Sequence, residues 1–167
     1  MQMQMPFKGA SAEVNEIVKW LVDDHKKFLK ELSSVESGLK SPSGGTWGDM
    51  EKFLKIVESL SGHLLIEEGT VFPELDMLPN KYPLKIVHLE HDDLERITTT
   101  ANRHIAGIVK YRDESQKQSA VESTLSVIKF IKRHFELEEE IIFPMIPHLA
   151  TEQQEKILPR LRLVERS

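Results

Sequence analysis

The chain has 167 residues, the usual length of one domain. It contains no cysteine, which excludes disulfides, thiolate zinc sites, iron–sulfur clusters and a cysteine nucleophile. Lysine and arginine number 22 against 27 acidic residues, a formal net charge of −5. Because the basic residues form no block, we expect no binding to nucleic acid or to a membrane surface. The sequence shows no apolar run long enough for a membrane span and no recognisable secretory signal, so we expect a cytoplasmic protein.

The first half of the chain predicts two long helices. Apolar residues over 11–37 recur with a period near 3.6, which is typical of an amphipathic helix. After a loop rich in serine, proline and glycine, Thr46 and Asp49 have the spacing of a capping box and open a second helix. We expect this helix to end at Gly69 or at the Phe72-Pro73 step.

The second half repeats this organisation. A third helix is predicted from about Pro83 to Tyr111, and a fourth over roughly 118–142, stopped by Phe143-Pro144. Thr151 and Gln154 have the spacing of a second capping box and open a short tail helix. No segment alternates with period two for long enough to predict a strand.

These elements predict an all-α fold. We expect an antiparallel up-down-up-down four-helix bundle over residues 11–150. A short N-terminal extension (1–10) precedes the predicted bundle, and the tail helix (151–167) follows it.

Four of the seven histidines lie on or beside the apolar faces of the predicted helices. His25 and His91 interrupt apolar stripes, while His63 and His134 lie at the edges of theirs. A single such histidine is usually a core residue with a hydrogen-bond partner. However, the sequence contains two H-x-x-x-E motifs, His63-Leu-Leu-Ile-Glu67 and His134-Phe-Glu-Leu-Glu138. Residues i and i+4 lie on one helix face, so each motif places an imidazole beside a carboxylate.

The two motifs belong to an internal repeat. The segments that begin at His63 and His134 align without a gap, and both end in Phe-Pro. The first and third helices match more weakly, with His25 aligned to His91. A duplicated helical hairpin brings these residues to one layer, because they lie at similar distances from the connecting loops. The residues predicted to converge are His25, His63, Glu67, His91, His134 and Glu138.

Such a cluster favours metal binding. Two buried carboxylates would repel each other, and bound cations remove this repulsion. Imidazole and carboxylate ligands without sulfur suit iron, manganese or zinc, and six side chains with two bridging carboxylates favour two metal ions over one. The Glu-x-x-His motif of ferritin-like proteins is absent from the sequence.

The full pattern resembles the hemerythrin-like, HHE cation-binding family. It comprises His25, the His63 and His134 motifs with their Phe-Pro ends, and His91 preceded by Glu90. The resemblance covers about residues 11–150. It implies two non-haem iron ions with a bridging oxo or hydroxo group, and a metal-binding protein more than a classical enzyme. It also implies that His25 and His63 bind mainly one iron, that His91 and His134 bind the other, and that Glu67 and Glu138 bridge them.

The sequence departs from the oxygen-carrying hemerythrins, which have a histidine where this chain has Val87. We therefore expect binding, sensing or reaction of oxygen, peroxide or nitric oxide rather than reversible carriage. Iron storage or donation, or a structural bundle with a zinc or empty site, are the alternatives. His88 is a candidate fifth imidazole or a flanking residue, while His104 and His148 are expected outside the site. Glu68 and Glu139 are expected to face solvent or to accept hydrogen bonds from ligands, and Asp24 and Glu90 to be surface charges.

Overall fold

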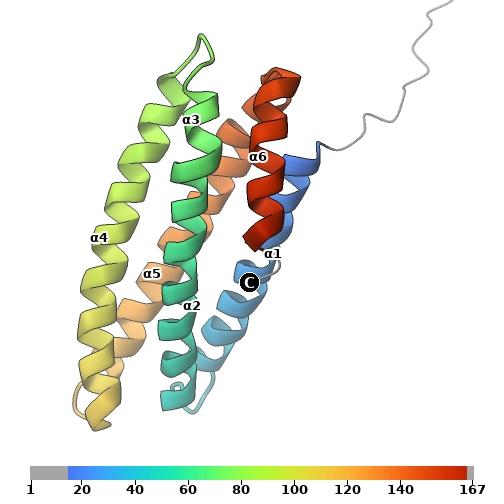
Figure 1. Cartoon of the computed structure of the whole chain (residues 1–167). Coiled ribbons are helices and arrows are strands. Elements are labelled where there is room, and N and C mark those ends of the chain that lie inside the picture. Colours follow the sequence, from blue (N-terminus) through green and yellow to red (C-terminus); the bar gives the residue numbers. More distant parts are fainter. Residues whose placement is uncertain (1–14, 165–167) are drawn as a thin grey trace, which may run out of the picture.

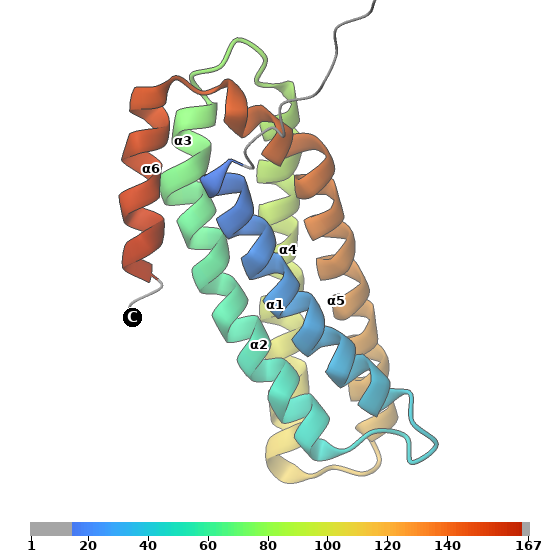
Figure 2. The same ribbon diagram turned by 90° about the vertical axis from the view of Figure 1, so that its right-hand side faces the viewer.

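The computed structural model describes residues 15–164. Within this part of the chain every regular element is helical and there is no strand, which confirms the predicted all-α class. Four long helices lie side by side and are connected at alternating ends (Figures 1 and 2). They are α1 (Glu16–Leu39), α2 (Trp47–Ile66), α4 (Tyr82–Tyr111) and α5 (Lys117–Leu137). A shorter helix, α6 (Thr151–Val164), packs against α1 (Figure 1).

Local capping fixes the starts of α1 and α2. The side-chain oxygen of Asn15 accepts hydrogen bonds from the backbone N–H groups of Ile17 and Val18, at 3.0 and 3.3 Å. These bonds satisfy donors that a helix start otherwise leaves without partners. At α2, the Asp49 N–H donates to Thr46 Oγ1 and the Thr46 N–H donates to the Asp49 carboxylate. The predicted capping box at Thr46 is therefore confirmed.

The two helices that carry the H-x-x-x-E motifs continue past the points where they were predicted to stop. Helix α2 passes into a π-helical turn, η1 (Glu67–Val71), and then into a short helix, α3 (Phe72–Leu75). Helix α5 passes in the same way into the π-helical turn η2 (Glu138–Ile142) and then into a 3₁₀ helix, η3 (Phe143–His148). Each Phe-Pro step thus changes the helix type without ending the helical run.

The Phe-Pro steps give a physical reason for the π turns. Proline has no N–H, and its ring crowds the carbonyl four residues earlier in an α-helix. A π turn is wider, and here the N–H of Phe72 donates to the carbonyl of Glu67 and that of Phe143 to Glu138, five residues back. Such turns are rare and occur frequently at functional sites. Here both of them begin at a glutamate of the H-x-x-x-E motifs.

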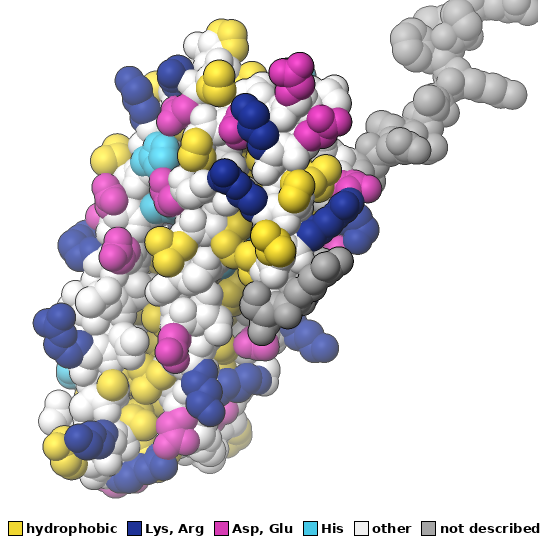
Figure 3. Space-filling view, in the orientation of Figure 1, with side chains coloured by type: hydrophobic (Ala, Val, Ile, Leu, Met, Phe, Trp, Pro, Cys, Tyr) yellow, Lys and Arg dark blue, Asp and Glu magenta, His cyan; other side chains and the backbone are white. Residues whose placement is uncertain are grey.

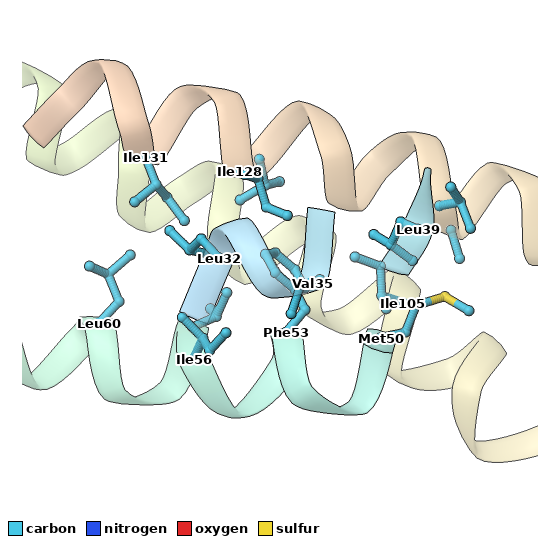
Figure 4. Close-up of a cluster of buried hydrophobic side chains, with 14 of the residues drawn as sticks. Leu32, Val35, Leu39, Met50, Phe53, Ile56, Leu60, Ile105, Ile128 and Ile131 are labelled. Atoms are coloured by element: carbon cyan, nitrogen blue, oxygen red, sulfur yellow. The ribbon is translucent and has the colours of Figure 1, made fainter. Parts of the chain in front are cut away.

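The core consists of two apolar clusters with a polar layer between them. The larger cluster fills the bundle on the side of the α1–α2 connection, and Figure 4 shows Leu32 of α1 packed among side chains of α2 and α5. The smaller cluster lies toward α6 and contains Leu21 and Phe72. On α1, buried His25 lies between Leu21 and Leu32, so it marks the boundary between the clusters.

Helix α6 closes the end of the smaller cluster with Ile157 and Leu161, both buried. The capping box predicted at Thr151 and Gln154 is wrong. Gln154 instead donates to the carbonyl of Leu149 and accepts a hydrogen bond from Asn15, so it ties α6 to the start of α1. The predicted extension (1–10), the predicted helix start at residue 11 and residues 165–167 lie outside the described residues.

No helix among residues 15–164 combines the length and the apolar character needed to cross a bilayer. The face of the molecule in Figure 3 carries acidic, basic and apolar side chains interspersed with one another.

Candidate metal centre

Each of the four long helices contributes one buried histidine to the polar layer. His25 and His134 have no exposed surface, and His63 and His91 are 3% and 5% exposed. The four imidazoles form two pairs that come from neighbouring helices. The Nε2 atoms of His25 and His63 are 3.2 Å apart, and the rings of His91 and His134 are 4.9 Å apart between centroids.

The two motif glutamates lie between the histidine pairs, and both are fully buried. Glu67 Oε1 is 3.3 Å from His63 Nε2, while its Oε2 is 3.6 Å from His91 Nε2. Glu138 Oε2 is 3.4 Å from His25 Nε2, while its Oε1 is 3.2 Å from His134 Nε2. Each carboxylate therefore directs one oxygen toward each histidine pair.

The structure thus brings together all six residues that the sequence singled out. Ligand atoms within 4.8 Å of one another form two groups with Glu138 in common. The first group contains His25, His63, Glu67 and Glu138, and the second contains His91, His134 and Glu138. That these atoms ligate metal stays a prediction.

Asp24 and Glu90 were expected to be surface charges, but each accepts a hydrogen bond from a histidine on the next helix. The Nδ1–H of His63 donates to Asp24 at 2.9 Å, and the Nδ1–H of His134 donates to Glu90 at 3.3 Å. This assigns the proton to Nδ1 and leaves Nε2 directed at the centre. The only sequence signal for this role is the position of each acid directly before a histidine, and it does not reveal that the partner lies on another helix.

Glu68 and Glu139, which directly follow the two motif glutamates, also accept hydrogen bonds from histidines of the layer. Together with Asp24 and Glu90 they form the four outer carboxylates. Glu139 accepts a hydrogen bond from His25 Nδ1 at 3.0 Å, and Glu68 accepts one from His91 Nδ1 at 2.7 Å. The four outer contacts follow the internal repeat, because each bond in one half has its counterpart in the other. Carboxylates that hold the distal nitrogen of an imidazole orient the ring and raise its basicity, an arrangement typical of metal-binding histidines.

The charges in the layer shift the pKa values of its members in opposite directions. Burial opposes the charged form of His63, but the carboxylates of Glu67 and Asp24 outweigh it and raise its pKa to about 10. Burial likewise opposes the charged form of His91, and Glu138, Glu67 and Glu68 together raise its pKa. In the metal-free protein, these imidazoles therefore bind protons that partly neutralise the carboxylates.

The carboxylates respond in the opposite sense. Burial would raise the pKa of Glu138, but the imidazoles of His134, His25 and His91 that surround its carboxylate hold that pKa well below the usual range. Burial would also raise the pKa of Asp24, but the hydrogen bond from His63 and the charges of His63, Lys27 and His25 together lower it. The lowered pKa values of Glu138 and Asp24 favour their ionised forms, which require positive charge nearby.

Protons alone do not satisfy this layer. Four atoms of the layer are buried and have no hydrogen-bond partner within residues 15–164: both oxygens of Glu67, Oε2 of Glu138 and Nε2 of His134. A buried polar atom without a partner costs about 1–3 kcal/mol, and more when it is charged. All four atoms belong to predicted ligands, and the one other such atom among the described residues is Oε2 of Glu74. The donor types of the four match a borderline divalent metal. The residues present therefore fit the metal ions that the sequence pattern implies.

The other histidines lie apart from this cluster. His88 donates from Nδ1 to Glu68 at 3.0 Å and belongs to neither ligand group, so it is a flanking residue. His104 contacts Ser119, and His148 is exposed.

Fold and site together define a helical cation-binding domain with a buried cluster of histidines and carboxylates. The family model of the hemerythrin HHE cation binding domain matches residues 16–146, and the chain belongs to this family. This confirms the family resemblance that the sequence pattern indicated. Searches of curated proteins and of solved structures return no match.

Proposed function

We propose that the cluster holds two iron ions and that the protein binds, senses or reacts with oxygen, peroxide or nitric oxide. The observation that carries the proposal is the placement of Glu67 and Glu138, each with one oxygen toward each histidine pair. A single ion cannot use both oxygens of both carboxylates together with four imidazoles and still leave room for solvent. The hemerythrin HHE family supports a cation at this place.

In this arrangement His25 and His63 bind one ion, and His91 and His134 bind the other. The alternating course of the four long helices, which we take as the up-down-up-down topology, supplies one histidine from each helix. The four outer carboxylates keep each Nδ1 protonated and each Nε2 free to ligate. The chain's own residues thus orient the donors, exclude bulk water and supply negative charge.

When bound, an iron pair supplies one-electron and two-electron chemistry with small oxygen and nitrogen species. The surroundings of the cluster favour reaction over reversible carriage. Val87 is buried where the oxygen carriers have a further histidine, and His88 is bonded to Glu68 instead of facing the cluster. Each ion therefore receives two imidazoles, and neither is saturated by protein ligands.

Metal analysis with optical spectroscopy tests the proposal. Protein loaded with ferrous iron without oxygen should contain two ions per chain and should oxidise on one exposure to oxygen without a long-lived adduct. His134→Ala should lose iron while it keeps its helical circular dichroism, and the control His148→Ala should retain both ions. Fewer than two ions per chain, or equal loss of iron in both variants, would contradict the proposal.

A further inference from the structure

A cavity of about 410 Å³ lies between α2 and α4, beside the candidate metal centre. Its α2 wall is apolar and includes Leu60 and Leu64, whereas its α4 wall carries Asp92 and Glu95. No lysine or arginine in the described part of the chain lines it. In the space-filling view, histidine and acidic side chains reach the surface together over the side of α4 that faces α2 (Figure 3).

The inner end of this cavity is part of the centre itself. His91 lines the cavity, and its Nε2 lies 3.0 Å from Glu138 Oε1. Glu68 also lines it, and one of its oxygens accepts hydrogen bonds from both His91 and His88. The side chains of His88 and Glu68 are 38% and 36% exposed. A continuous series of imidazole and carboxylate groups thus runs from the surface to the cluster.

The internal repeat provides a comparison on the opposite side of the centre, between α1 and α5. There Phe135 stands at the position of Leu64, and its ring stacks on His25 with centroids 3.9 Å apart and an angle of 14° between the planes. The position equivalent to Asp92 on this side is occupied by Lys26, which is largely exposed. The same framework is therefore closed by an aromatic ring on one side and hollow with an acidic rim on the other.

We propose that the cavity between α2 and α4 is the route by which divalent metal ions reach the centre, and this rests on the proposed function. A rim of one charge sign around a cleft concentrates ions of the opposite sign and accelerates their association. Carboxylate and imidazole groups along the route exchange for the waters of a hydrated cation. The route leads first to the ligand group that contains His91 and His134. This group has three residues, whereas the group that contains His25 and His63 has four.

The rate of Co²⁺ uptake by the metal-free full chain tests this proposal, measured by stopped-flow absorbance of the bound ion. The double variant Asp92→Asn, Glu95→Gln should slow uptake roughly tenfold at low salt, with a smaller effect at high salt because the charges are screened. The matched control Glu31→Gln, Glu155→Gln removes two exposed acids elsewhere and should leave the rate unchanged. All these proteins should finally bind the same amount of metal.

Leu64→Phe tests the width of the route, because it introduces the residue that closes the opposite side. Leu64→Phe should slow metal uptake at every salt concentration. Leu64→Ala should not slow it, and this smaller variant keeps the test valid if the larger ring disturbs folding. Unchanged rates in the rim variant and in Leu64→Phe, with normal final metal content, would overturn the route and leave the proposed function standing. Failure of the wild-type chain to bind metal would overturn the proposed function instead.

Discussion

The two sides of the metal centre use the same framework but differ in access. His25 and His91 occupy equivalent places in the repeat, and each has a phenylalanine from a Phe-Pro step nearby, Phe143 at 5.1 Å and Phe72 at 5.2 Å between ring centroids. Only His25 also has Phe135 stacked against it. This difference shows that a duplicated helical hairpin keeps the same candidate ligands on both sides of a site. A few flanking residues then determine which side is accessible from the surface.

The largest expected effect concerns the two bridging candidates. The carboxylate of Glu138 lies against three histidines and is hydrogen-bonded to His91 at 3.0 Å, whereas neither oxygen of Glu67 has a hydrogen-bond partner among the described residues. We expect Glu138→Gln to lose both ions in equilibrium dialysis and Glu67→Gln to retain one. Equal metal content in the two variants would show that the glutamates are equivalent despite their different surroundings. Glu67→Asp should bind more metal than Glu67→Ala, because a shorter carboxylate still offers oxygen ligands.

The second prediction concerns pH and the metal-free protein. The pKa of His63 is raised from 6.5 to about 10 in the folded state, so its protonated form stabilises the fold fully below pH 6.5. The free energy of unfolding, measured with urea, should fall as pH rises from about 6.5 to 10, by an amount on the order of a few kcal/mol. In His63→Gln the free energy of unfolding should depend less on pH over this range. An equally steep decline in that variant would contradict the role assigned to His63.

Acid should act through Glu138 in the opposite sense. Because the pKa of Glu138 is lowered on folding, its contribution is present above its ordinary pKa of 4.5 and is lost as pH falls below that value. Metal binding requires imidazoles that have lost a proton, so metal affinity should rise with pH where the metal-free protein becomes less stable.

The outer carboxylates should have intermediate effects. Asp24→Asn and Glu90→Gln each remove the charge that holds a distal histidine nitrogen, and we expect each to weaken Co²⁺ affinity by about 10–100-fold. The two variants should agree, because Asp24 and Glu90 are equivalent in the repeat and their histidines, His63 and His134, are both buried. Glu31→Gln is the control for the loss of one acid. An affinity unchanged in both variants would show that these contacts do not support ligation.

The smallest effect concerns the starts of α2 and α5, which are equivalent in the repeat but capped differently. Thr46 and Asp49 form a capping box, whereas Gln116 at the start of α5 makes no side-chain capping bond. Thr46→Ala should therefore lower the free energy of unfolding by about 1 kcal/mol. Gln116→Ala should change it by less than about half of that. Similar losses in thermal denaturation of the two variants would contradict the difference.

Much of the fold was predictable because it depends on local signals. The apolar period of 3.6 and the capping box at Thr46 specify helices without reference to distant residues. The six clustered residues were predictable from the repeat, since the i to i+4 spacing pairs each imidazole with a carboxylate and similar distances from the connecting loops bring the helices' motifs to one layer. The π turns were not predicted, because the Phe-Pro steps read locally as helix ends.

The outer contacts and the cavity depend on pairings between helices that sequence spacing does not encode. Asp24 and Glu90 look like ordinary surface acids until α2 and α5 bring His63 and His134 against them. The unequal access to the two sides arises from Leu64 and Phe135, which are both plain core residues in the sequence. Only the packed structure shows that one ring covers a histidine.

Anomalous diffraction from crystals of the iron-loaded protein tests the central claim most directly. Data recorded on both sides of the iron absorption edge should show two iron peaks per chain in the polar layer. One should lie beside His25 and His63 and the other beside His91 and His134, with Glu67 and Glu138 contacting both. A single peak shared by all four histidines, or iron bound elsewhere while this layer stays without metal, would contradict a two-metal centre.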